Sequence, residues 1–96
     1  MNSRQRAQLR GMANSLNPLF QVGKGGVNSQ FIQQADAALE KRELIKLGVL
    51  ETAPESASEV AETVAAATGA EVVQVIGRKF VLYRESKENK TIQLVK

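Results

Sequence analysis

The spacing of apolar residues changes period several times along the chain, and this pattern limits the possible fold more than any other feature. Between residues 9 and 16 the apolar residues recur at intervals of three and four, as on one face of a helix. Between residues 44 and 50 they alternate, as in a half-buried strand. Two further helical stretches and three further strand-like stretches are present. The order predicts an α/β (α+β sandwich) chain of helix, strand, helix, strand, helix, strand and strand.

Caps, breakers and apolar faces set the expected element boundaries. We predict helices from Ser3 to Asn17-Pro18, from Asn28 or Ser29 to about Arg42, and from a Ser56/Glu59 capping box to Gly69. Strands are expected over residues 19–22, 44–50, 71–76 and 80–84, with a tight turn at residues 77–79. The expected core faces of the helices are Leu9, Met12, Ala13, Leu16; Phe31, Ala35, Ala38, Leu39; and Val60, Ala61, Val64, Ala67.

Composition excludes several functional classes. The chain has 96 residues with neither cysteine nor histidine, which removes disulfides, thiol nucleophiles, imidazole bases and the usual zinc ligands. We therefore expect a protein without catalytic activity, metal or cofactor, forming a single domain over residues 1–96 with a polar tail at 85–96. No apolar run is long enough to span a membrane or act as a signal peptide, so we expect a cytoplasmic protein. We also expect a monomer.

Charged residues are segregated along the chain although the net charge is only +3. Residues 51–75 hold five acidic side chains and no basic one, whereas residues 1–50 and 76–96 are both basic overall. A surface that is basic on one side suits a polyanionic ligand. The alternative is a solvated surface whose charge blocks have no functional meaning.

A glycine-rich segment, Gly23-Lys24-Gly25-Gly26, lies between a predicted strand and a predicted helix N-terminus. Such a loop brings free N–H groups close to a ligand, and the helix dipole favours phosphate there. The spacing fits neither a P-loop nor a dinucleotide fingerprint, because no lysine follows Gly26 and residue 28 is asparagine. It does fit the G-x-x-G loop with which KH-type domains clamp single-stranded nucleic acid. Glycines needed only for the turn remain the alternative.

Aromatic and acidic residues carry less functional signal. Phe20, Phe31, Phe80 and Tyr83 fit core positions, and the segment around Phe80 lacks most of the RRM signature. The acidic residues mostly cluster around the third predicted helix, without an apolar setting that would raise a carboxyl pKa. We expect a solvated acidic face there.

Three ordered motifs stand out: residues 18–27 around the glycine loop, residues 39–46 (LEKRELIK) and residues 75–84 (VIGRKFVLYR). Together they resemble the YhbY family, the stand-alone bacterial form of the CRM (chloroplast RNA splicing and ribosome maturation) domain. The resemblance extends from the first helix to Arg84. It implies an α/β domain with a four-stranded mixed sheet, and non-catalytic binding of RNA from the large-subunit precursor during ribosome assembly.

Candidate RNA-binding residues follow from the loop, the basic side chains and this resemblance. Gly23, Lys24, Gly25 and Gly26 would clamp the backbone, and the candidate phosphate contacts are Lys41, Arg42, Lys46, Arg78 and Lys79. Whether these groups converge is left open by their spacing. The alternative function is a ribosome-associated protein-interaction module, in which Glu59 and Glu62 on the third helix dock a basic ribosomal protein.

Overall fold

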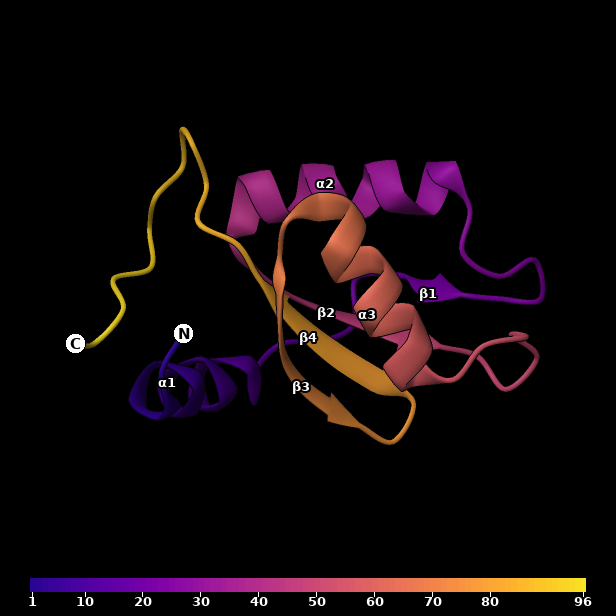
Figure 1. The fold of residues 1–96 in the computed structure, drawn as a ribbon, viewed down its shortest axis with the longest axis horizontal. Helices are drawn as coiled ribbons and strands as arrows, with labels where there is room; N and C mark the ends of the chain where they lie inside the picture. The colour runs from indigo at the N-terminus through magenta and orange to yellow at the C-terminus, as the bar shows by residue number, and fades with distance from the viewer.

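The computed structural model describes residues 1–96 and contains three helices and one four-stranded sheet (Figure 1). In chain order the elements are α1 (Ser3–Ala13), β1 (Gln21–Val22), α2 (Ser29–Arg42), β2 (Leu44–Val49), α3 (Ala57–Thr68), β3 (Glu71–Ile76) and β4 (Lys79–Tyr83). This order confirms the one predicted from the sequence. None of the helices combines the length and the apolar character needed to cross a membrane.

The sheet is mixed, with strand order β1-β2-β4-β3. The edge strand β1 runs parallel to β2, with Val22 opposite Val49, while β2 and β4 are antiparallel, with Leu47 opposite Phe80. The C-terminal ends of β1 and β2 and the N-terminal end of β4 therefore lie at the same end of the sheet. Three connections meet there: residues 23–28, residues 50–56 and the β3–β4 turn (Figure 1). We call this the loop end.

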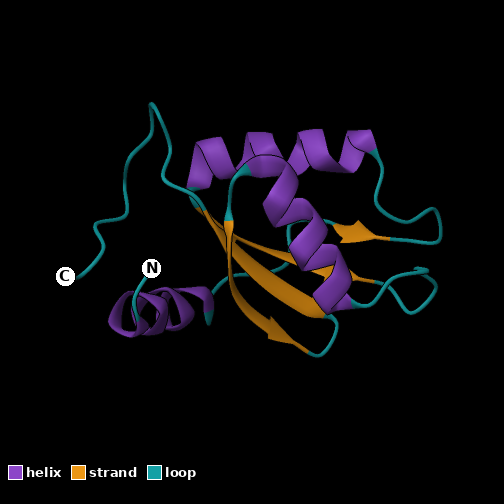
Figure 2. Cartoon of the chain, viewed as in Figure 1, coloured by secondary structure: helices purple, strands orange, loops and turns teal.

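The two faces of the sheet are covered differently (Figure 2). Helices α2 and α3 pack on one face over a core that includes Ile45, Leu47, Phe80 and Leu82. Helix α1 covers only part of the other face, where a second cluster comprises Leu9, Ala13, Leu44, Val73, Val81 and Tyr83. By strand alternation Lys46 and Lys79 also belong to this second face, outside the cluster that α1 covers.

A bulge in β3 fixes the position of α1. The pairing between β3 and β4 shifts register between Val72 and Gln74. The guanidinium group of Arg6 donates hydrogen bonds to the carbonyl oxygens of Val72 and Val73, at 2.6 and 3.1 Å. Arg6 thus ties α1 to the sheet at the bulge.

Five local predictions were wrong in detail. Asn2 rather than Ser3 caps α1, because its side chain and that of Gln5 form a capping box. Helix α1 ends at Ala13, ahead of the predicted Asn17-Pro18 stop, and β1 comprises only Gln21–Val22. Ala67 is exposed and β4 begins at Lys79, which was predicted to belong to the turn. In α3, Ala65 and Thr68 complete the buried face instead of Ala67.

The segment after β4 has no regular secondary structure, but it is held to the sheet by a buried carboxylate. Glu43 is fully buried between α2 and β2, with a positive φ of 67°. Its side chain accepts hydrogen bonds from the backbone N–H groups of Ser86, Thr91 and Ile92, at 2.7 to 2.8 Å. Ile92 and Leu94 then pack against the second core cluster. The tail is therefore part of the fold.

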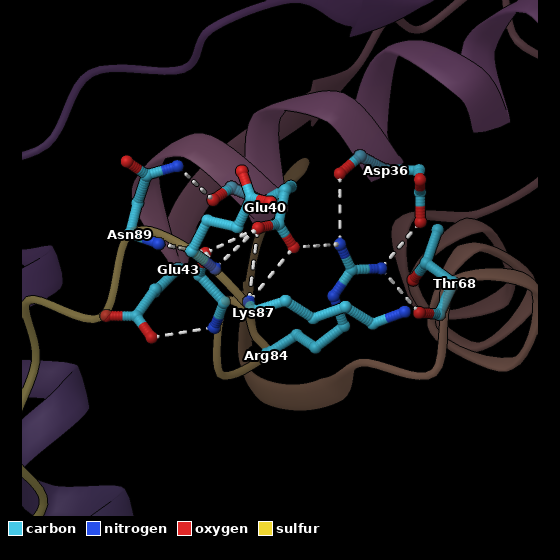
Figure 3. Close-up of polar contacts among 9 residues, drawn as sticks. Asp36, Glu40, Glu43, Thr68, Arg84, Lys87 and Asn89 are labelled. Carbon is cyan, nitrogen blue, oxygen red and sulfur yellow. Dashed lines mark hydrogen bonds and ion pairs between the residues drawn. The ribbon is translucent and has the colours of Figure 1, made fainter.

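Glu40 and Arg84 extend this network across the end of the molecule (Figure 3). The Glu40 carboxylate accepts a hydrogen bond from the Ser86 hydroxyl group, with an oxygen–oxygen distance of 2.7 Å. It also accepts hydrogen bonds from the backbone N–H groups of Lys87 and Glu88. This hydrogen bond from Ser86 is the main reason that the pKa of the Glu40 carboxyl is lowered. Arg84 pairs with Asp36 and also donates to the carbonyl of Thr68, which links β4 to both α2 and α3.

Replacement of Glu43 by Gln tests how much this network contributes to stability. The new NH2 group would face backbone N–H donors in a buried site. We expect the free energy of unfolding at pH 7 to fall by about 1–3 kcal/mol, since a charged acceptor is lost and donors are left unpaired. Urea unfolding followed by circular dichroism measures the change.

The same variant has a predictable pH dependence. Burial raises the pKa of the Glu43 carboxyl, but the donors from Ser86, Ile92 and Thr91 outweigh burial, so its pKa lies below the ordinary value of 4.5. Its contribution to stability is complete above this ordinary value and is lost as the pH falls through the lower folded-state pKa. Glu43→Gln should show a weaker loss over this acid range. Glu88→Gln is the matched control, because the Glu88 side chain makes no hydrogen bond; equal acid sensitivity of wild type and Glu43→Gln would contradict the assignment.

Candidate functional site

The glycine loop is a closed turn at the loop end of the molecule. The N–H of Gly26 donates to the carbonyl oxygen of Gly23 at 3.0 Å, and Lys24 and Gly25 are exposed at its tip. Phe20 and Phe31, which flank the loop in sequence, pack edge to face with ring centroids 5.2 Å apart. This aromatic contact fixes the start of the loop against the first turn of α2.

One side of the loop lies directly against the connection between β2 and α3. Gly26 has a φ of +72°, and a Cβ atom there would lie 2.9 Å from Glu55 Oε1 and 3.1 Å from Pro54 Cγ. Position 26 therefore requires glycine for both conformation and space. Gly25 has nothing within 4 Å of the corresponding Cβ position, so the opposite side of the loop faces open solvent.

A polar groove of about 290 Å³ lies between the glycine loop and the first turns of α2. Amide side chains dominate its lining: Gln21, Asn28, Gln30 and Gln34. Asn28 caps the helix by accepting the N–H of Phe31 at 2.9 Å, and no acidic residue lies in the first turn. The helix N-terminus thus presents partial positive charge and unpaired N–H groups beside the groove, an arrangement suited to an anionic ligand.

Two of the predicted cationic residues lie at the same end as the glycine loop. The carbonyl oxygen of Arg78 accepts the N–H of Val49, the residue opposite Val22 in β1. Two strand spacings, about 10 Å, therefore separate the β3–β4 turn from the start of the glycine loop. Lys79 begins β4 beside this turn. The guanidinium group of Arg78 lies 3.8 Å from the Glu51 carboxylate in an exposed pair, which water screens strongly.

The remaining predicted cations do not gather around the loop. Lys41 and Arg42 occupy the last turn of α2, about 20 Å along the helix from the glycine loop. Lys46 lies between the two ends on the α1 face of the sheet, where it is a diagonal neighbour of Lys79 across β2 and β4. Diagonal neighbours of this kind lie about 7–8 Å apart. The structure thus divides the predicted site into a loop-end group and a second group at the far end of β2.

The sequence interpretation missed the amide side chains of the groove. Gln30 and Gln34 are one helical turn apart on α2, and Gln21 lies on β1, so helical spacing alone pairs only two of them. The signal that was available was the absence of acidic residues from the first turn of α2. On α3, Glu59 accepts the N–H of Ser56 in the predicted capping box, which lowers the Glu59 pKa, and Glu62 is exposed.

Comparison of the chain with known proteins identifies relatives of similar length. The CRS1 / YhbY (CRM) domain family matches residues 1–84. The "Probable RNA-binding protein YqeI" of Bacillus subtilis is 49% identical, with 98% of each chain covered. An "RNA-binding protein" of Haemophilus influenzae is 35% identical over 98% of this chain and 94% of its own. The solution structure of the hypothetical protein SAV1595 from Staphylococcus aureus superposes with a TM-score of 0.82 at 49% identity, covering 99% of both chains.

Alanine substitutions at the two glycines test the geometry of the loop. Gly26→Ala should lower the free energy of unfolding by about 1–2 kcal/mol, the cost of a left-handed residue, with a further penalty from the contact with Pro54. Gly25→Ala is the matched control and should leave thermal stability unchanged, because its Cβ would enter open space. Equal melting temperatures for the two variants would show that the loop is not held as described.

Proposed function

The chain belongs to the CRS1 / YhbY (CRM) domain family, and we propose that it is a non-catalytic protein that binds single-stranded RNA through the glycine loop and neighbouring cations. The single observation that carries this proposal is the exposed tip of the loop. Lys24 and Gly25 project beside a polar groove and a helix N-terminus that contains no acid. Relatives named as RNA-binding proteins share nearly the whole chain.

Backbone contacts are expected to dominate the binding. A phosphate seated at the tip would receive N–H donors and the positive end of the α2 dipole, while Lys24 would supply a full charge. Lys79 and Arg78 would contact further phosphates along the loop end, and Lys46 would continue this path onto the sheet face. Such contacts give affinity that depends on salt and tolerates different sequences.

The amide groups of the groove favour a single strand over a duplex. Gln21, Gln30 and Gln34 carry both donors and acceptors, which can pair with the edges of bases that are not already paired. In an RNA duplex those edges are largely engaged or lie in a groove that side chains do not enter. The proposed ligand is therefore an unpaired segment of RNA.

The family resemblance directs the proposal to ribosomal RNA of the large-subunit precursor, bound during ribosome assembly. Crosslinking in cells, followed by sequencing of the attached RNA, tests this assignment. We expect enrichment of large-subunit ribosomal RNA, with crosslinks concentrated at unpaired segments. A profile dominated by messenger RNA would contradict the ribosomal assignment while leaving RNA binding intact.

The clamp role of Lys24 has a quantitative signature in the salt dependence. Lys24→Gln should weaken binding of a single-stranded ribosomal RNA fragment and flatten the slope of log affinity against log salt by about one unit, since one phosphate contact is lost. Fluorescence anisotropy over a salt series measures the slope.

Lys96→Gln provides the matched control for this measurement. It makes the same change in net charge at the exposed C-terminal residue, and the tail is held against α1 rather than near the glycine loop. The control should keep the wild-type slope. Equal slopes for Lys24→Gln and wild type would contradict the clamp.

A further inference from the structure

A second recess lies on the opposite half of the sheet from the glycine loop. It has a volume of about 340 Å³ and opens between the end of α1, the start of β2 and the C-terminal tail. Its apolar wall is formed by Met12, Leu16, Leu19, Leu44 and Ile92. Met12 and Leu19 are each 40% exposed, so this apolar surface is not covered by the chain itself.

The polar groups of the recess are few and are placed at its margin. Asn17 supplies an amide that makes no hydrogen bond within the protein, and Thr91 supplies a hydroxyl. Arg42 and Lys46 bring two positive charges, and neither pairs with a carboxylate. No acidic residue lines the recess. A ligand that fits would therefore have an apolar body, a polar edge that can pair with one amide, and a negative charge for the two cations.

We propose that this recess holds an unpaired nucleobase of the bound RNA, with the adjoining phosphate on Arg42 and Lys46; the inference rests on the proposed function and deepens it. A nucleobase has a flat apolar face, donors and acceptors on its edge for Asn17, and an attached anion for the cations. The volume lies near the lower end of the range for small-ligand pockets, about 300–1,000 Å³. This assignment also gives Arg42 a role in RNA binding, although it lies far from the glycine loop.

The tail contributes one side of the recess and is held there by Glu43. The N–H groups of Thr91 and Ile92 both donate to Glu43 Oε1, at 2.7 and 2.8 Å. These two bonds place the Ile92 side chain against the second core cluster and the Thr91 hydroxyl at the margin. The recess is therefore a product of tail docking.

Titration of the full chain with adenosine and uridine 5′-monophosphates, observed by methyl NMR, tests the site directly. We expect saturable shifts at the methyl groups of Met12, Leu16, Leu44 and Ile92. Arg42→Gln and Lys46→Gln should each weaken mononucleotide binding about tenfold, the cost of one hydrogen bond to a charged group. Lys90→Gln is the control, because Lys90 lies in the same exposed tail but does not line the recess, and it should bind as wild type.

Two further titrations decide what the recess recognises. Inorganic phosphate alone should leave the methyl groups unshifted, and octanoate should bind more weakly than the mononucleotides. Methyl shifts as large with phosphate, or tighter binding of octanoate, would overturn the assignment to a base. An oligouridylate with a single abasic position should bind less tightly than the intact strand to wild type, and this difference should shrink in the Arg42→Gln variant.

Failure of this inference and failure of the proposed function give different results. If RNA binds with the salt dependence described for Lys24 but mononucleotides leave the methyl groups of these four residues unshifted, the base recess is wrong and the glycine-loop function stands. If mononucleotides shift those methyl groups and RNA does not bind, the recess accepts nucleotides and the RNA function is wrong.

Discussion

The buried carboxylate of Glu43 holds the C-terminal tail to the sheet and to the end of α2. Its burial would cost several kcal/mol if it were unpaired, and its positive φ adds about 1–3 kcal/mol. Three backbone N–H groups and the hydroxyl of Thr91 offset the burial by donating to it. Its main chain also accepts the N–H of Arg84 and donates to Leu39. The end of α2, the start of β2, the end of β4 and the tail are therefore positioned by one residue.

This connection has a consequence for the two candidate binding regions. The glycine loop follows β1 and rests on residues 54–55, so its shape depends on the loop end alone. The recess beside α1 depends on the tail, and hence on Glu43. A change that releases the tail would remove a wall of the recess without touching the glycine loop. The two regions share a sheet but have separate structural requirements.

Local sequence signals predicted the order of elements correctly, and they failed where distant contacts decide the outcome. The Ser56/Glu59 box and the glycine at position 69 are short-range devices, and both appear as predicted. Ala67 was placed in the core by its spacing, yet the actual packing of α3 on the sheet buries Ala65 and Thr68 instead. Met12 likewise fits the helical stripe but is exposed beside the recess.

The sequence singles out the glycine loop and five further cations as candidate site residues but leaves their grouping in space open, and their role in binding stays a prediction. The glycine loop was recognisable because strand, glycines and helix cap are contiguous in sequence. The arrangement of the cations depends on strand order, which places Lys79 beside β2 and leaves Arg42 at the far end of α2. The tail showed no periodic pattern, since its order comes from side-chain acceptors over 40 residues earlier in the chain. Because these acceptors lie far away in the sequence, no local pattern in the tail reveals that it is ordered.

The separation of the two regions also bears on the form of RNA that the proposed function requires. The glycine loop lies at the loop end, whereas the recess lies at the start of β2 on the α1 face. Six residues of β2, about 20 Å of extended chain, lie between them, with Lys46 along the way. A base can enter the recess only if it leaves the base stack. An RNA strand that runs from the loop end to the α1 face of the sheet must also bend. Both requirements are met at low cost by a flexible single strand, and a rigid duplex meets neither.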